Sequence, residues 1–367
     1  MLKKTLVSTF TALYALVAHS QTEPTPPVPL TAPPPVLSVT GSADLYYRYD
    51  FSKNQNNNRT SFTNSHNSFE LGMATVKLAH KTAKLEMVAD LGFGKRAREF
   101  SYTDDNGTGR DVIFSAIKQL YISYAPAPWV KFTGGTWATH VGYELVDAYA
   151  NRNYSMSYMF TNGPFSHTGV RVDLTKGKSG FMIGVANATD YKYVPSSSLN
   201  KKFLLAQYSY AASDNFKFYL NYVGGQAPDT SKSSQFDAVI TAKLSSKFSI
   251  GYNGTVNNAK TRSDGKFNTA RSWWGSAIYL NLDPSGSFGL TLRGEYFSDK
   301  NSLKVFSTTP GGGSVFATTL SANFKVSSFI FIPELRLDNA SKDIFTKSNG
   351  NATSSAGNFL LAAIYSF

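Results

Sequence analysis

Hydrophobic and polar residues alternate almost one by one from Leu37 to the C-terminal residue. Successive side chains of a β-strand point to opposite faces, so this alternation predicts strands with one apolar and one polar face. The first segment is about as long as a strand that crosses a bilayer, roughly ten residues. Its two faces are Val39, Gly41, Ala43, Leu45, Tyr47 and Tyr49 against Thr40, Ser42, Asp44, Tyr46, Arg48 and Asp50.

The same pattern recurs along the chain and is clearest in its second half. We interpret the apolar face as lipid-facing and the other as water-facing, because a soluble sandwich would expose these aromatic faces to water. Four segments show it: Phe216, Phe218, Leu220 and Tyr222 against Lys217, Tyr219 and Asn221; Phe236, Ala238, Ile240, Ala242 and Leu244 against Asp237, Thr241 and Lys243; Phe288, Leu290, Leu292 and Tyr296 against Thr291, Arg293 and Glu295; Phe329, Phe331, Leu335 and Leu337 against Glu334, Arg336 and Asp338.

Short and long connections take turns between these segments. Seven short and eight long connections join sixteen strands, which predicts an all-β fold, an antiparallel transmembrane β-barrel with short periplasmic turns and long extracellular loops. An even strand count places both ends of the barrel on the short-turn side. The short connections are 80–84, 125–128, 175–180, 213–215, 245–247, 283–287 and 326–328, and the long ones are about 51–68, 94–112, 137–165, 189–202, 225–234, 258–269, 299–314 and 341–355.

The third long connection decides this count. If residues 154–160 (YSMSYMF) formed a wall strand, there would be seventeen strands and a short connection on the wrong rim. Treating 137–165 as one loop restores the even number. A loop of this length is expected to fold into the lumen, as the third loop of a large porin does.

The N-terminus carries two segments outside the predicted barrel of residues 37–367. Residues 1–20 combine Lys3 and Lys4 with an apolar stretch and a small-residue cleavage site, which predicts a secretory signal peptide rather than a membrane anchor. Residues 21–36 are rich in proline, which favours an extended, stiff periplasmic linker; a recognition motif is the less favoured alternative.

The last strand has a specific pattern. In residues 357–367 (GNFLLAAIYSF), aromatic and aliphatic residues occupy every second position back from Phe367, including Tyr365. This resembles the C-terminal strand that the outer-membrane assembly machinery recognises, so Tyr365 and Phe367 are predicted to carry the assembly signal.

Composition excludes several classes of protein. The absence of cysteine among 367 residues rules out disulfide scaffolds, thiolate zinc sites and a lipid-modified cysteine. Residues 172–179 lack the first glycine of a phosphate-binding loop, and the spacing of His140 and Glu144 lacks the rest of a zinc-helix motif. No catalytic residue, cofactor or metal is therefore predicted. The formal net charge of +12 becomes +10 once the two signal-peptide lysines are removed.

Several motifs resemble the OmpL-like outer-membrane porin family of Bacteroidetes. The resemblance covers roughly residues 90–170, and beyond it only the barrel pattern matches. It implies a barrel in the outer membrane of a Gram-negative bacterium and says little about the substrate. The motifs are residues 91–94 (LGFG), 118–124 (KQLYISY), 135–144 (GTWATHVGYE), 151–158 (NRNYSMSY) and 163–169 (GPFSHTG).

The predicted inward faces carry charges of both signs in nearly equal number. A wall so mixed would pass small polar solutes, with ion preference set at the narrowest section and at most a mild anion preference overall. The inward residues are Arg48, Lys131, Arg171, Lys217, Lys243, Arg293, Lys325 and Arg336 against Glu86, Asp90, Asp173, Asp237, Glu295, Glu334 and Asp338. In the loops, Lys201, Lys202, Lys260 and Arg262 are candidates to bind lipid-headgroup phosphates or to be plain solvated charges.

The third loop is the predicted constriction. Its acids Glu144 and Asp147 would face the wall arginines Arg48, Arg171, Arg293 and Arg336 and create a transverse field, and Arg152, its only strong base, belongs to the same predicted constriction. Aromatic residues of the same loop are equally suited to pin it to the wall by packing. These are Tyr143, Tyr149, Tyr154, Tyr158 and Phe160. Aromatic residues near strand ends suit the interfacial girdles: Tyr124, Trp129, Trp273, Trp274, Phe329 and Phe367.

The sequence thus predicts an outer-membrane diffusion porin that is not an enzyme. Alternatives are a barrel whose loops form an adhesin or receptor surface, and a barrel enzyme. Expected partners are outer-membrane lipid and lipopolysaccharide, the barrel assembly machinery and small polar solutes, with no nucleic acid. A homotrimer is an option that large porins often take and that no feature of the sequence requires.

Overall fold

The fold is a closed β-barrel in a computed structural model that describes residues 36–104 and 112–367. One sheet contains 17 strands, and it closes because β1 (Val36–Asp50) pairs with both β2 (Ser68–Lys81) and β19 (Ser355–Ser366). Strand β12 (Lys266–Phe267) pairs only with the end of β11, so sixteen strands form the wall. The predicted strand count is confirmed. The predicted signal peptide and nearly all of the proline-rich linker lie outside the described residues.

Further strands complete the wall, and short helices and one small strand pair lie in the connections between wall strands. The other wall strands are β3 (Leu85–Phe93), β4 (Ile117–Ala127), β5 (Val130–Ala138), β6 (Ser166–Lys176), β7 (Ser179–Ala186), β8 (Phe203–Ser213), β9 (Phe216–Gln226), β10 (Ser231–Lys243), β11 (Phe248–Ser263), β13 (Arg271–Ser285), β14 (Phe288–Asp299), β15 (Gly313–Val326) and β16 (Phe329–Ala340). The connections contain α1 (Lys95–Phe100), α2 (Val112–Ser115), α3 (Tyr158–Asn162), η1 (Gln55–Asn57), η2 (Ala148–Ala150), η3 (Ser197–Leu199) and the pair β17 (Phe345–Thr346) and β18 (Ala352–Thr353).

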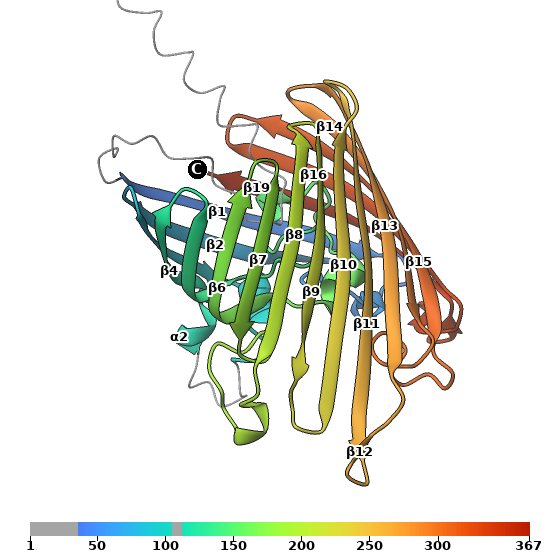
Figure 1. Cartoon of the computed structure of the whole chain (residues 1–367). Helices are drawn as coiled ribbons and strands as arrows, with labels where there is room; N and C mark the ends of the chain where they lie inside the picture. Colours follow the sequence, from blue (N-terminus) through green and yellow to red (C-terminus); the bar gives the residue numbers. More distant parts are fainter. Residues whose placement is uncertain (1–35, 105–111) are drawn as a thin grey trace, which may run out of the picture.

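Every neighbouring pair of wall strands is antiparallel, and the connections lie at two opposite ends of the barrel (Figure 1). We number the connections on the long-loop side as loops 1 to 8. They are residues 51–67, 94–116, 139–165, 187–202, 227–230, 264–270, 300–312 and 341–354. Loop 5 corrects the predicted range 225–234, because β9 and β10 remain paired as far as Gln226 and Lys232 and leave four residues to turn the chain.

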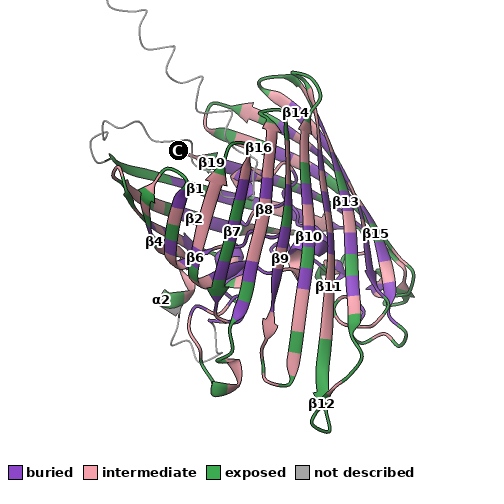
Figure 2. Ribbon diagram, in the orientation of Figure 1, coloured by how far each residue is buried: buried purple, intermediate pink, exposed green. Residues whose placement is uncertain are grey.

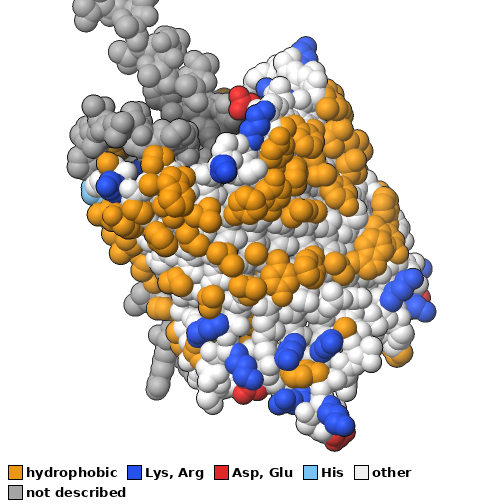
Figure 3. All heavy atoms as spheres, in the orientation of Figure 1, with side chains coloured by type: hydrophobic (Ala, Val, Ile, Leu, Met, Phe, Trp, Pro, Cys, Tyr) orange, Lys and Arg blue, Asp and Glu red, His pale blue; other side chains and the backbone are white. Residues whose placement is uncertain are grey.

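The outer surface carries the predicted apolar face. Hydrophobic side chains form a broad band around the visible face, and Lys and Arg side chains gather beyond it at the long-loop end (Figure 3). Trp129, Trp274 and Phe367 are exposed on this surface. Trp273 is a correction: it is fully buried and faces the lumen, because Trp274 beside it points outward and adjacent strand residues point to opposite faces.

The interior of the barrel contains many buried side chains. Buried residues form bands along the strands (Figure 2), and many of them are charged. On β19, Leu360, Ala362 and Ile364 are buried on the inner face, while Phe359, Leu361 and Tyr365 are exposed outside, as the alternation predicts. None of the helices in the described segments is long and apolar enough to cross a membrane.

Candidate functional site

Loop 3 runs across the inside of the barrel. It leaves the end of β5, crosses the lumen and returns to β6, and residues 154–160 lie within it rather than in the wall. Its residues form hydrogen bonds with ten wall strands from different sides: β1, β4, β6, β8, β9, β10, β13, β14, β15 and β16. The predicted inward fold of the third loop is therefore present.

Two wall glutamates hold the backbone of loop 3. Glu334 on β16 accepts hydrogen bonds from the N–H groups of Tyr154 and Ser155, at 2.8 and 3.1 Å. Glu295 on β14 accepts from the N–H groups of Tyr158 and Met159, both at 2.8 Å. Both carboxyl groups are buried and each accepts two backbone hydrogen bonds, so they fix the loop rather than face passing solutes.

Glu144 is a fixed part of this arrangement. Its carboxylate forms an ion pair with Arg293 on β14 and accepts hydrogen bonds from the Ser157 N–H at 2.8 Å and the Tyr279 hydroxyl at 3.2 Å. Arg293 is fully buried and also donates to the Ser155 carbonyl at 2.7 Å. The sequence predicted both residues for the constriction, and the structure brings them together.

Asp147 pairs with a residue that the sequence pattern does not single out. Its carboxylate lies 2.6 Å from the ammonium group of Lys118 on β4, which also lies 3.2 Å from Asp90 on β3. The Lys118 side chain is almost completely buried, whereas that of Asp147 retains 17% of its accessible surface. Lys118 stands in the KQLYISY motif, but a β-bulge near Ile117 turns it inward, and strict alternation does not predict that.

Arg152 lies toward the short-turn end. Its guanidinium group forms a bidentate pair with Asp283 on β13, with N–O distances of 2.6 and 3.0 Å, and donates to Thr291 at 2.8 Å. The Arg152 side chain keeps 24% of its accessible surface. Asp147 and Arg152 are thus loop 3 residues of opposite charge that remain in contact with solvent.

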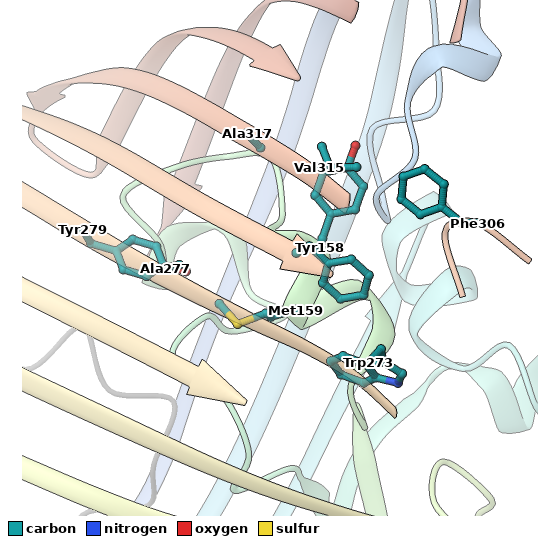
Figure 4. Packing of buried hydrophobic residues seen from close by; sticks show 9 residues of the cluster. Tyr158, Met159, Trp273, Ala277, Tyr279, Phe306, Val315 and Ala317 are labelled. Carbon is teal, nitrogen blue, oxygen red and sulfur yellow. The ribbon is translucent and has the colours of Figure 1, made fainter. Parts of the chain in front are cut away.

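Aromatic packing supports the same loop. Tyr158 and Met159 lie in one cluster with Trp273 and Phe306 (Figure 4), to which Phe297 also belongs. Tyr143 stacks on Tyr279 with ring centroids 4.2 Å apart, and the Tyr154 hydroxyl donates to Asp44. The predicted aromatic packing of loop 3 is therefore present beside its charged residues, and the constriction remains a prediction. The aromatic residues of this packing are Tyr143, Tyr154, Tyr158 and Phe160, with Tyr149 half-buried against Tyr46, Tyr154 and the inner face of β19.

Arg96 is a site residue that the sequence pattern does not reveal. It lies in α1 of loop 2 and is fully buried, with its guanidinium carbon 4.9 Å from the ring centre of Phe62 and 4.6 Å from that of Tyr154. It donates to the carbonyl oxygens of Val146 and Tyr154 at 3.2 and 3.3 Å. Loops 1 and 2 thereby fasten loop 3 from the extracellular side.

The remaining predicted constriction residues are buried in ion pairs of the wall. Arg48 pairs with Asp50 at 3.0 Å, Arg171 with Asp173 at 3.3 Å, and Arg336 with Asp338 at 2.8 Å. Arg336 also donates to the Met156 carbonyl at 2.7 Å. Arg171 stacks over Trp137 on the inner face of β5 and β6, with its guanidinium carbon 5.0 Å from the ring centre. Arg48 and Arg171 therefore lie apart from the carboxylates of loop 3.

Asp190 of loop 4 joins three loops. It accepts hydrogen bonds from the N–H groups of Phe165 and Ser166 at 2.7 and 2.9 Å and from the Tyr102 hydroxyl at 2.9 Å. Burial raises the pKa of the Asp190 carboxyl to about 6, although these hydrogen bonds oppose the rise. In loop 3, burial lowers the pKa of His140 to about 4, so this imidazole is neutral at neutral pH.

The described residues contain no group of three or more His, Asp or Glu side chains arranged to hold a metal ion. The sequence contains no cysteine to extend such a group.

A closed sixteen-stranded barrel with an apolar outer belt, a charged interior and a loop across its lumen defines an outer-membrane β-barrel of the porin class. The chain belongs to the family described as "Putative beta-barrel porin-2, OmpL-like", whose model matches residues 36–367. Among curated proteins, no match is found.

Solved porin and channel structures share the fold at low sequence identity. The anion-selective porin from Comamonas acidovorans has a TM-score of 0.59 at 9% identity, covering 91% of this chain and 100% of that one. The trimer form of OmpT, an outer membrane protein of Vibrio cholerae, has a TM-score of 0.58 at 11% identity, covering 91% and 99%. The outer membrane channel DcaP of Acinetobacter baumannii has a TM-score of 0.58 at 10% identity, covering 91% and 97%.

Proposed function

We propose that this barrel conducts small hydrophilic solutes and ions passively, with loop 3 as the constriction. The observation that carries the proposal is the position of Asp147 and Arg152. Both lie on a loop that crosses the lumen, and both keep solvent contact while the surrounding arginines are buried. A fixed carboxylate and a fixed guanidinium group on the path past loop 3 select ions by charge. No chemical step and no cofactor is involved.

Single-channel recording in planar bilayers tests this function. Asp147→Asn removes a negative charge and should shift permeability toward anions, whereas Arg152→Gln should shift it toward cations. A unit charge about 5 Å from the ion path in water contributes roughly 0.8 kcal/mol, so each change should be roughly fourfold in the permeability ratio.

The matched control is Asp264→Asn with Asp343→Asn, two exposed acids in loops 6 and 8. These should leave selectivity unchanged. The absence of stable open steps in the wild-type protein, or equal selectivity of all variants, would reject the proposal. Glu144→Gln is less informative, because it also leaves buried Arg293 without its carboxylate partner.

We further propose a homotrimer in a lipopolysaccharide-containing membrane, inserted by the barrel assembly machinery. Support for the trimer is that the similar OmpT structure is described as a trimer form. Support for lipopolysaccharide binding is the band of Lys and Arg side chains at the long-loop end, beyond the apolar belt (Figure 3). Native mass spectrometry from detergent measures the oligomer, and a monomer at all detergent concentrations would reject the trimer.

A further inference from the structure

The short-turn end of the lumen carries a set of lysines that we call the lysine vestibule: Lys77, Lys81, Lys131, Lys243 and Lys325. They come from four strands, β2, β5, β10 and β15, each within a few residues of a short turn. Each takes an inward position in its strand. Lys77 lies between exposed Val76 and Leu78, for example, and Lys325 between exposed Phe324 and Val326.

Within the described residues, no ion pair involves any lysine of the vestibule. Three acids face inward near the same level: Glu86, Asp173 and Asp283. Two of them are already paired, since Asp173 lies 3.3 Å from Arg171 and Asp283 lies 2.6 Å from Arg152. The vestibule therefore has an excess of positive charge.

The middle of the lumen is arranged differently. Its cations include arginines held in ion pairs, such as Arg293 with Glu144 and Arg336 with Asp338. Fixed charge therefore changes along the axis of the barrel, from balanced at loop 3 to positive at the short-turn mouth. The net charge of the whole chain does not reveal this separation.

A hollow lies inside this mouth, between the first three short turns. Its volume is about 80 Å³, and it is partly open to solvent. Lys81, Lys84 and Lys131 line it together with the polar side chains of Ser123 and Ser209. Glu86 and Asp173 line it as well, so three cations face two acids there. Hydroxyl and ammonium groups around one hollow are suited to anionic oxygen atoms, whether of phosphate or carboxylate groups.

We propose that the lysine vestibule binds small multivalent anions at the periplasmic mouth and makes conduction asymmetric in favour of anions. The conduction part rests on the proposed function, whereas the binding part does not. Several lysines acting on one multivalent ion sum their attractions, and low-dielectric walls focus the field inside the mouth. Salt screens this attraction, with a Debye length of about 8 Å at physiological ionic strength. The effect should therefore weaken as the ionic strength rises.

The experiment uses inorganic triphosphate as the probe. In planar bilayers, triphosphate added on the short-turn side should block current at a lower concentration than triphosphate on the loop side. The vestibule variant Lys77→Gln, Lys131→Gln, Lys243→Gln, Lys325→Gln should raise the half-blocking concentration at least about tenfold. The chain has no cysteine, so one cysteine placed in loop 6 and modified from one side reports the orientation of the inserted barrel.

The matched control neutralises four exposed lysines at the loop end: Lys260, Lys266, Lys300 and Lys342. It should leave the block unchanged. Calorimetric binding of triphosphate to the detergent-solubilised barrel separates the two proposals, because it needs no conduction. Binding lost in the vestibule variant but kept in the control supports the inference even if no channel opens. No binding, or equal binding to all three proteins, overturns the inference even if the channel conducts.

Discussion

At the scale of single residues, the lumen shows how a buried charge is tolerated. A buried ion without a partner costs several kcal/mol, so a charge persists inside a barrel only where partners surround it. Arg293 and Arg336 meet this condition with a carboxylate and loop 3 carbonyl oxygens. Substituting one member of such a pair lowers the free energy of unfolding by more than the attraction of that pair, because it leaves the other charge buried and unpaired.

Asp190 gives a pH prediction. Its pKa rises from 3.8 to about 6 on folding because the carboxyl is buried. The folded state therefore holds this proton more tightly than the unfolded state. The stabilisation from protonated Asp190 is complete below pH 3.8 and is lost as the pH rises through about 6. Relative to Asp190→Asn, the wild-type barrel should lose up to about 3 kcal/mol of unfolding free energy across this window.

Thermal unfolding in detergent at a series of pH values measures the difference between these two proteins. The control is Asp264→Asn, an exposed acid in loop 6, which should track the wild type at every pH. Parallel curves for wild type and Asp190→Asn between pH 4 and pH 7 would contradict the assignment.

Sequence alone identified some site residues and not others, for a physical reason. Glu144, Asp147 and Arg152 stand out because they are the charged residues of one long loop. Which wall residue pairs with each of them does not follow from the sequence, because Glu144 and Arg293, for example, are 149 positions apart. Only the closed barrel determines which strands face each other across the lumen. Arg96 was not identified either, since nothing in the sequence of loop 2 shows that its short helix packs against loop 3.

At the scale of elements, glycines on the inner face of the wall leave room for the side chains of loop 3. A Cβ atom on Gly251 of β11 would lie 2.6 Å from the ring of Tyr143, and one on Gly275 of β13 would lie 2.4 Å from Met159. These close approaches need glycine on the inner face. The loop and the wall therefore form one packed unit rather than a loop lying freely in a channel.

Gly251→Val should displace Tyr143 and loosen loop 3 while leaving the wall intact. Trypsin should then cut after Arg152 several times faster in the folded barrel, since overpacking of this kind typically costs about 1–3 kcal/mol. Fluctuation of the open-channel current should also increase. Gly294→Val is the control, because Gly294 faces outward and its nearest neighbouring atom lies 3.9 Å from the Cβ position. Equal cleavage rates in both variants would show that the contact between Tyr143 and Gly251 does not hold the loop.

The wall strands were predictable because a two-residue period specifies both their faces and their register. The error at Trp273 is instructive, since consecutive tryptophans cannot both join an outer girdle in a regular strand. Loop 5 was predicted too long because the Gly, Ser and Lys residues of 225–234 resemble a loop, although Gly225 and Ser233 continue the ladder between β9 and β10. Strand pairing at this end of β9 and β10 therefore outweighs the loop-like composition of the segment.

At the scale of the whole molecule, one seam closes the cylinder. Strand β19 pairs with β16 on one side and with β1 on the other, so the last strand must arrive before any closed wall exists. Phe367 completes the seam. Its N–H donates to the Gly41 carbonyl and its carbonyl accepts from the Gly41 N–H, both at 3.0 Å. Its ring lies against Gly41 on the lipid side and is 61% exposed.

Phe367→Ala separates two roles of this residue. The backbone bonds of the seam survive the change, and the exposed ring contributes little to a finished barrel, so refolding into lipid vesicles should lose no more than about 1 kcal/mol. If the ring is read by the assembly machinery, the amount of folded barrel in cells should fall several-fold. Phe359→Ala is the matched control, because Phe359 faces lipid on the same strand. Equal losses in cells for both variants would assign Phe367 an ordinary lipid contact, and a collapse of vesicle refolding would assign it to the seam instead.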